Sequence, residues 1–525
     1  MSAPISRRAF VRGAAASSLA VSVAPGAAVA RPRRSALPDA HTVAARGADP
    51  ADLDVVEAAA LLQARILSSA ELVAACQRRI AARNGAVTFD GSATEINAWI
   101  RLHPDLAEQG ARAADARLSA RSVRRQGAAP LLCGVPLALK DLYAVAGKGL
   151  QASSHVLDGN VAAQDSTVWA RLRAAGMVLL GHTHTHEFAI GTSTPQTGNP
   201  WDVSKIIGGS SGGSAAALAA RMVPAATGSD TGGSLRYPAA LGGVTSIKPT
   251  LGRVSTHGVI PLSWTLDHAG PMARSAADLG LLLAAMQGAD PADGQTHAFA
   301  GDTAAYPLRP AAGPRRLRGV RIGLPDVPAA SSLDPGVATI VERFHGELQA
   351  MGATLVPITA PADGTGTATI AADIDTYHRQ FIARSDGYGT ATAAEIQALR
   401  ALNTSAYDYL QSQRARAALG AAWDALFAAQ RLDAVAQVVW TGEPTDRSST
   451  AGALLGALAS NGHISTWNNT GFPVVTTPAG TSPATGIPVG MQLIGRPHTE
   501  AVLLRLALGH QADHPYVSDV PPHLA

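Results

Sequence analysis

Short apolar runs alternate along most of the chain with segments in which apolar residues recur at helical spacing. The short runs are typical of buried strands, and the segments between them predict helices. Strands that alternate with helices favour an α/β fold with a mixed, mostly parallel central sheet surrounded by helices. We predict strands over 135–139, 177–180, 224–227, 244–247, 319–324 and 354–356, and helices over 166–175 and 214–220.

Two helices carry local start signals. Ser68 and Glu71 have the spacing of a capping box, in which each side chain bonds the backbone N–H of the other residue. Asp334 precedes a proline, which is favoured at the first position of a helix, and Gly352 is typical of a helix end. These signals predict helices that begin after Ser68 and after Asp334.

The composition divides the chain into three parts. Residues 1–30 have the composition of a targeting segment, and residues 31–50 are rich in Arg, Pro and Ala, as in a linker. The alternating pattern fills residues 51–520, which predicts one large domain. Within it we expect a catalytic core over 130–280 and an Ala-rich helical specificity region over 360–460.

Residues 1–30 are predicted to be an export signal. Arg7, Arg8 and Phe10 precede a mildly apolar stretch, and small residues at 28–30 form a cleavage site. The arginine pair resembles the twin-arginine signal, which implies a periplasmic or secreted protein; a disordered basic tail is the alternative. No later segment has about 18 continuous apolar residues, so we expect no stable membrane insertion after cleavage.

The charge of the chain argues against a nucleic-acid partner. The formal net charge is +3, and the export segment alone contributes three arginines and no acid. The remaining chain is therefore neutral overall, and a basic surface for nucleic acid is not expected.

Two glycine- and serine-rich runs, at 208–214 and 228–236, carry the strongest chemical signal. Glycine lets backbone N–H groups come close to a ligand, and serine supplies a nucleophile or a proton carrier. A Gly-Gly turn before Ser234 leads into a predicted helix, so N–H groups there could stabilise an oxyanion. A plain turn and a phosphate-binding loop are the alternatives, but the patterns of Walker A and dinucleotide loops are absent.

Lys140 ends an apolar run in a chain that otherwise prefers arginine. The sequence has 42 lysines and arginines together, of which only Lys140, Lys148, Lys205 and Lys248 are lysines. Lysine can lose its proton when burial lowers its pKa, whereas arginine stays charged. Lysine and the two serine runs together suggest acyl-transfer chemistry that needs no histidine.

Three blocks of the sequence, at 134–141, 208–214 and 228–236, resemble the amidase signature family. The resemblance covers nearly all of residues 51–515. It implies one large α/β domain and a Ser–cisSer–Lys triad. By motif position, the nucleophile falls on Ser234, the bridging serine with a cis peptide bond on Ser210, and the base on Lys140.

The resemblance also implies a mechanism and a set of supporting residues. Neutral Lys140 takes a proton from Ser210, which takes one from Ser234, and Ser234 attacks the amide carbonyl to form an acyl-enzyme. The oxyanion is expected to rest on the N–H groups of Thr231, Gly232, Gly233 and Ser234. Ser211, Asp230 and Arg236 are expected to hold the loop by hydrogen bonds.

The residues predicted to contact the substrate, and the role predicted for the histidines around position 184, do not come from the three family blocks. Pocket candidates are Ile190, Gly191, Thr192, Trp440 and Trp467. His182, His184 and His186 could share a strand face and bind a metal, but no acidic or cysteine partner is evident in the sequence. We therefore expect hydrogen bonding at the pocket rim, and neither a metal nor another cofactor.

The main functional prediction is an exported serine hydrolase that cleaves a carboxylic amide bond through an acyl-enzyme on Ser234. Its partner would be a small-molecule amide, and the protein would be a monomer or homodimer. One alternative is an amidotransferase A-type subunit that works with partner subunits. Further alternatives are a hydrolase acting mainly on esters or carbamates, and an amidase fold used only for binding.

Overall fold

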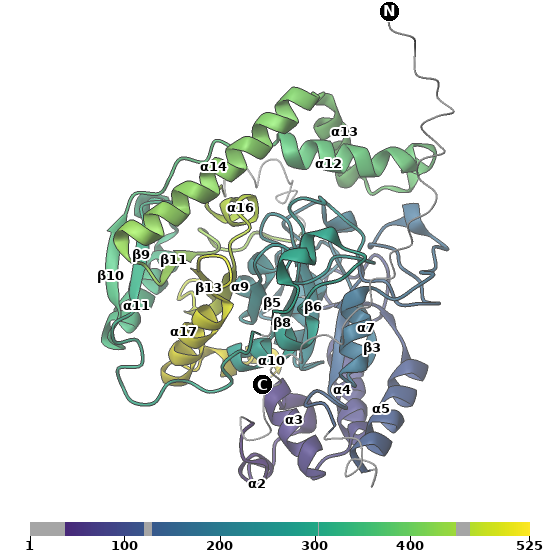
Figure 1. The fold of residues 1–525 in the computed structure, drawn as a ribbon. Coiled ribbons are helices and arrows are strands. Elements are labelled where there is room, and N and C mark those ends of the chain that lie inside the picture. The colour runs from purple at the N-terminus through teal and green to yellow at the C-terminus, as the bar shows by residue number, and fades with distance from the viewer. Residues whose placement is uncertain (1–36, 120–128, 303, 448–461, 525) are drawn as a thin grey trace, which may run out of the picture.

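An 11-stranded sheet organises the molecule and is flanked by helices (Figure 1). The structure is a computed structural model and describes residues 37–119, 129–302, 304–447 and 462–524. The α/β domain with a mixed central sheet, predicted from the sequence, is confirmed. The export signal predicted over 1–30 lies outside the described residues and stays a prediction.

The sheet combines parallel and antiparallel strands. In sheet order the strands are β1 (Trp99–Leu102), β3 (Val178–Thr183), β2 (Pro136–Lys140), β6 (Ala225–Asp230), β8 (His268–Ala273), β7 (Thr245–Lys248), β12 (Val474–Thr481), β13 (Pro488–Ile494), β11 (Ala434–Val438), β9 (Arg321–Pro325) and β10 (Thr354–Ile358). Parallel pairs join β2 to β3 and β6, and β9 to β10 and β11. The strands β8, β7, β12 and β13 between these two groups pair antiparallel and join them into one sheet.

Helices cover the sheet and extend beyond it at one end. They are α2 (Ala40–Ala44), α3 (Val55–Ala64), α4 (Ser69–Arg83), α5 (Pro104–Ser119), α7 (Thr167–Ala174), α8 (Gly212–Ala219), α9 (Arg236–Gly242), α10 (Ala276–Met286), α11 (Pro335–Ala350), α12 (Ala368–His378), α13 (Thr390–Ala401), α14 (Ala406–Gln430), α16 (Gly462–Asn469) and α17 (Glu500–Asp513). A small ribbon of β4 (Gly198–Asn199) and β5 (Asp202–Ile206) lies outside the main sheet. None of the helices that the structure describes is both long and apolar enough to cross a membrane.

Local signals in the sequence set the helix boundaries well. The Ser68 side chain accepts the Glu71 N–H, and Glu71 in turn accepts the Ser68 N–H, so the predicted capping box is present. The Asp334 side chain accepts the N–H of Gly336 and begins α11, which ends two residues before Gly352. Capping satisfies N–H groups that the first helical turn leaves unpaired.

The predicted linker and specificity region can be compared with the described structure. Residues 40–44 of the linker form α2, and Leu37 and Val43 are buried against the core. In the specificity region, α12, α13 and α14 lie together at one end of the molecule, near α16 (Figure 1). The chain then enters the sheet as β11. The predicted domain boundaries themselves stay predictions.

The carboxyl ends of two parallel strands define the place of the candidate site. Lys140 is the last residue of β2, and Asp230 is the last residue of β6, its neighbour in the sheet. Since parallel strands end at the same edge, the two residues and the loops that follow them come together there. The helices α8 and α9 begin next to this edge, within the last residues of the two glycine- and serine-rich runs.

Candidate active site

Lys140 lies fully buried at the centre of a cluster of serine hydroxyls. Its Nζ lies at hydrogen-bond distance from Ser210 Oγ at 2.7 Å, from Ser211 Oγ at 2.9 Å and from Ser229 Oγ at 2.9 Å. The predicted lysine and bridging serine are therefore in direct contact. Ser229 was not among the predicted site residues, although it precedes Asp230 within the second serine-rich run.

The surroundings of Lys140 favour its neutral form. Burial lowers its pKa to about 7, although the nearby charges of Asp267 and Asp230 act in the opposite direction. The carboxylate of Asp141 does not oppose this shift, because it pairs with Arg101 at 2.9 Å and accepts the N–H of Ser153 at 3.0 Å. A neutral lysine amine can accept a proton, so Lys140 has the chemistry of a general base near neutral pH.

Ser210 lies in the first serine-rich run, two residues before α8 begins at Gly212. The peptide bond between Gly209 and Ser210 is cis, as the family resemblance implies. The Ser210 carbonyl accepts the N–H of His186 at 3.0 Å and the Thr194 hydroxyl at 3.3 Å. Backbone contacts thus hold the residue while its hydroxyl faces Lys140.

Ser234 lies in the turn between β6 and α9, close to the same cluster. Its carbonyl accepts the N–H of Ser211 at 3.3 Å, which joins the two serine-rich runs. The residue is 6% exposed, and its hydroxyl makes no hydrogen bond within residues 37–119, 129–302, 304–447 and 462–524. The structure therefore brings Lys140 and Ser210 together directly and places Ser234 beside Ser211 with its hydroxyl uncommitted.

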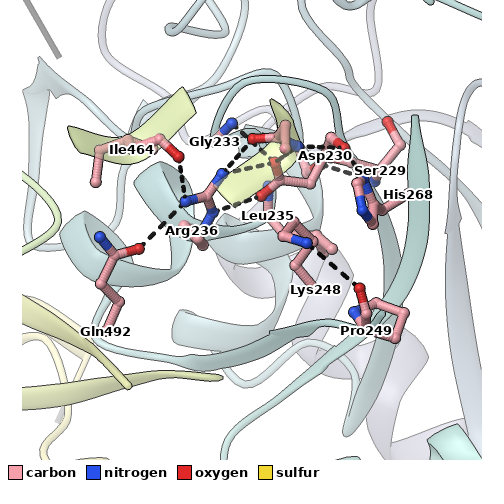
Figure 2. A network of polar contacts seen from close by, with 12 residues as sticks. Ser229, Asp230, Gly233, Leu235, Arg236, Lys248, Pro249, His268, Ile464 and Gln492 are labelled. Atoms are coloured by element: carbon pink, nitrogen blue, oxygen red, sulfur yellow. Dashed lines mark hydrogen bonds and ion pairs between the residues drawn. The ribbon is translucent and has the colours of Figure 1, made fainter. Parts of the chain in front are cut away.

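A buried ion pair holds the turn that carries Ser234 (Figure 2). Arg236 Nε donates to Asp230 Oδ2 at 3.0 Å, and both side chains are fully buried. Burial alone would raise the pKa of Asp230, but the charge and hydrogen bonds of Arg236 lower it below its usual range. The Arg236 guanidinium also donates to the carbonyl of Ile464 and to the side chain of Gln492 (Figure 2). Asp230 and Arg236 thus hold this loop by an ion pair and hydrogen bonds, and their predicted support of catalysis stays a prediction.

The same carboxylate changes the predicted set of oxyanion donors. The N–H of Gly233 donates to Asp230 Oδ1 at 2.8 Å, so this donor is already committed (Figure 2). In the described part of the chain, the N–H groups of Thr231, Gly232 and Ser234 have no hydrogen-bond partner. Asp230 therefore occupies the Gly233 N–H in this structure, and within the described residues the other three N–H groups are open to an oxyanion; the predicted set of donors stays a prediction.

A cavity of about 320 Å³ adjoins this loop at Thr231. Most of its wall comes from the segment before and within α12 and from one face of α16. The lining is rich in hydroxyl and amide groups, and Asp363 is the only charged residue among the described residues that line it. The lining residues are Thr231, Leu266, Asp363, Thr365, Gly366, Thr367, Thr369, Ile370, Gly462, Ser465 and Asn469.

None of the five predicted pocket residues lines this cavity. Ile190 is buried, and Trp440 packs edge to face against Tyr237. Trp467 belongs to α16, but its ring packs against Trp423 and its Nε1 donates to Gln437. The sequence therefore predicted a residue of α16, the helix that borders the cavity, but on the wrong face of that helix. A single tryptophan does not show which face of its helix lines a cavity.

The three histidines at 182, 184 and 186 are buried and contact protein groups rather than a pocket rim. His182 lies 2.9 Å from the His103 ring nitrogen and 3.0 Å from the Tyr143 carbonyl. His184 lies 2.9 Å from the Thr88 carbonyl. Burial lowers the pKa of His182 to about 3 and that of His184 and His186 to about 4, which keeps all three neutral. Within the described residues, no group of three or more His, Cys, Asp or Glu side chains could hold a metal ion.

A family model described as Amidase matches residues 71–504 of the chain. The chain belongs to the amidase signature family. This amidase is thus an enzyme of a family that acts on carbon–nitrogen bonds, and the serine and lysine cluster at the sheet edge is its candidate active site.

The relatives of this chain carry several different names. Curated proteins named as the A-type subunit of glutamyl-tRNA(Gln) amidotransferase include one from Ralstonia nicotianae, 38% identical over 86% of this chain and 96% of the relative. Another, from Anaeromyxobacter sp., is 35% identical over 87% of this chain and 95% of the relative. Among solved structures, a peptide amidase from Stenotrophomonas maltophilia has a TM-score of 0.75 and 30% identity, covering 90% of this chain and 98% of that chain.

These relatives correct the main functional prediction. The expectation of an exported hydrolase that works on its own is wrong, because the similar curated proteins carry the name of an amidotransferase subunit. A solved structure with the same name, from Thermotoga maritima, has a TM-score of 0.70 and 25% identity, covering 90% of this chain and 98% of that chain. The matches therefore favour the alternative that the sequence left open.

Proposed function

We propose that this amidase is the A-type subunit of an amidotransferase and releases ammonia from a carboxamide donor such as glutamine. The observation that carries the proposal is the match to proteins of that name over 86–87% of the chain. The direct contact between Lys140 and Ser210 supports the proposed acyl transfer, since it provides a base within hydrogen-bond distance of the bridging serine. A glutamyl-tRNA is the proposed acceptor of the ammonia, reached through partner subunits.

The proposed reaction passes a proton along the triad and forms an ester on Ser234. Neutral Lys140 accepts the proton of Ser210, and Ser210 accepts the proton of Ser234. At the same time, the oxygen of Ser234 bonds to the carboxamide carbon. The carbonyl oxygen becomes negatively charged beside the free N–H groups of the 231–234 turn. The C–N bond then breaks, and the nitrogen leaves as ammonia with the relayed proton. Water hydrolyses the ester, so that the donor leaves as a carboxylic acid.

Ammonia release from glutamine tests this proposal. The chain is expressed with a tag at native abundance, captured with its partners, and assayed for ammonia release and for amide transfer to glutamyl-tRNA(Gln). We expect both activities to depend on the partners and to be lost in Ser234→Ala. A purified chain that hydrolyses peptide amides at full rate alone, with no glutamine activity in either state, would overturn the proposal.

The predicted export signal over residues 1–30 bears on the same question. Amide transfer to a tRNA-bound substrate needs the cytoplasm, whereas a cleaved signal would place the enzyme outside it. Cell fractionation of the full chain, with Arg7→Lys/Arg8→Lys as the control that blocks twin-arginine export, locates the active protein. Recovery of all active protein outside the cytoplasm would contradict the proposed amide transfer.

A further inference from the structure

Asp267 links the loop that carries Ser234 to the segment that precedes β8. Its Oδ1 accepts the Thr231 hydroxyl and the N–H of Ser263, the latter at 3.1 Å, and its Oδ2 accepts the N–H of Leu262 at 2.9 Å. The carboxylate is almost fully buried, with the residue 8% exposed. No cationic side chain bonds it within the described part of the chain. Asp267 is thus a buried anion whose partner on the active-site side is the hydroxyl of Thr231.

The peptide group between Asp230 and Thr231 is held on its carbonyl side. The Asp230 carbonyl accepts Asn468 Nδ2 at 3.0 Å and lies 3.2 Å from His268 Nδ1. In a trans peptide group the carbonyl and the N–H point in opposite directions, so fixing the carbonyl also directs the N–H of Thr231. The bond from the Thr231 side chain to Asp267 fixes the other side of the same residue. Both ends of Thr231 are therefore restrained around an N–H that has no partner of its own.

We propose that Asp267 is a positioning residue for acyl transfer, which holds Thr231 so that its free N–H meets the developing oxyanion. The inference rests on the proposed acyl transfer at Ser234, since only that reaction creates the oxyanion. Thr231 also lines the cavity beside the loop, so the N–H that Asp267 positions lies next to the space that a donor amide would enter.

The charge of Asp267 also acts on Lys140. Burial lowers the pKa of Lys140, and Asp267 is the first of the two carboxylates that raise it, the other being Asp230. Burial raises the pKa of Asp267 itself to about 6, and the charge of Asp373 adds to this increase. Other titratable groups near the pair include the Tyr143 hydroxyl, on which Asp267 acts, the His186 ring, on which Lys140 acts, and His268, whose pKa burial lowers. Asp267 is ionised above about pH 6, and its negative charge keeps the pKa of Lys140 higher than burial alone would make it.

Labelling of Ser234 by a fluorophosphonate tests the inference without knowledge of the natural donor. The Ser234 oxygen bonds to phosphorus, fluoride leaves, and the proton passes to Lys140, so the rate reports both the base and the oxyanion site. The variants are Asp267→Asn, Thr231→Val, Thr231→Ser and the double variant Asp267→Asn/Thr231→Val. Asp424→Asn, at a surface ion pair with Arg496, is the matched control.

We expect Asp267→Asn and Thr231→Val each to lower the maximal labelling rate by about 10- to 100-fold, with little change in probe affinity. The double variant should be no slower than the slower single variant, because one interaction is removed only once. Thr231→Ser keeps the hydroxyl and should retain most of the rate, and Asp424→Asn should match the wild type. In both variants that carry Asp267→Asn, but not in the Thr231 single variants, the rising part of the pH profile should shift to lower pH, because a charge that raises the Lys140 pKa is gone.

Three results would overturn the inference. If folded Thr231→Val is labelled at the wild-type rate, Asp267 does not act through Thr231. The same conclusion follows if the rate loss of the double variant equals the product of the losses of the two single variants. An unshifted pH profile in folded Asp267→Asn would exclude action on Lys140. If Asp267→Asn does not fold, Thr231→Val and Thr231→Ser still decide the first point. A wild-type chain that is not labelled at Ser234 would instead refute the proposed function, and the inference with it.

Discussion

At the scale of single residues, the candidate site depends on Lys140, because burial lowers its pKa and favours the neutral amine that can accept a proton. Lys140→Arg keeps a positive charge in the same place but cannot supply a neutral base. We expect fluorophosphonate labelling of Ser234 to fall by about 10²- to 10⁴-fold, the usual contribution of a positioned general base. Lys205→Arg is the matched control. Lys205 pairs with Asp446 at the surface and takes no part in the proposed proton transfer, so this variant should leave the labelling rate unchanged. Equal losses in both variants would contradict the role of Lys140.

The pH dependence of labelling follows from the same residue. Because the pKa of Lys140 is about 7, the lysine is mostly protonated below that pH and mostly neutral above it. The labelling rate should therefore rise about tenfold per pH unit below pH 6 and level off above about pH 8. A series of labelling rates from pH 5 to 9 measures this profile. A rate that falls as pH rises through 7 would show that the protonated form is the active one.

The sequence predicts the reacting residues better than the residues that hold them. Lys140, Ser210 and Ser234 lie in dense motifs, and the structure brings the first two into contact. Ser229 and Asp267 were missed: Ser229 lies inside a predicted block, but Asp267 lies in an ordinary stretch and reaches the site only because β8 pairs with β6. A partner supplied by strand pairing leaves no spacing pattern in the sequence.

At the scale of elements, the pair of Asp230 and Arg236 connects β6 and α9 to α16 and β13 (Figure 2). Arg236→Met would leave a buried carboxylate without its cation, which costs about 3–5 kcal/mol of unfolding free energy. Arg496→Met removes the exposed partner of Asp424 and should cost no more than about 1 kcal/mol. Urea unfolding of both variants measures the difference. A similar small loss in each would show that the buried pair does not stabilise the turn.

The cavity beside the loop is also a property of elements, since α12 and α16 supply most of its wall. Ser465→Phe on α16 would fill part of the space of about 320 Å³. We expect weaker binding of bulky amide donors and little change in labelling of Ser234 by a small fluorophosphonate. Ser332→Phe on the exposed surface is the matched control and should change neither measurement. Equal loss of labelling in Ser465→Phe would mean that the substitution disturbs the catalytic loop itself.

Sequence patterns predicted these elements unevenly. The strands β2, β3 and β6 were predicted as apolar runs, with ends within a few residues of those observed. The strands β8, β12 and β13 were not predicted, although they join the two parallel groups into one sheet. All three contain Gly and Pro among the apolar residues, and β12 also contains Thr, which weakens the apolar pattern of a buried strand.

At the scale of the whole molecule, one hydrophobic core joins the chain from Leu37 to Leu508. Its members lie in both parallel groups and in the antiparallel centre of the sheet, so the two groups share this cluster, and a separate cluster packs Trp423 and Trp467 against β11 and β12. We therefore expect the full chain to unfold in urea in one transition, even though chains above about 150 residues often show intermediates. Tryptophan fluorescence, far-UV circular dichroism and residual labelling of Ser234 should give the same midpoint. Loss of labelling at clearly lower urea than the other two signals would show that the α12–α14 end opens separately, because α12 lines the cavity that adjoins the Ser234 loop at Thr231.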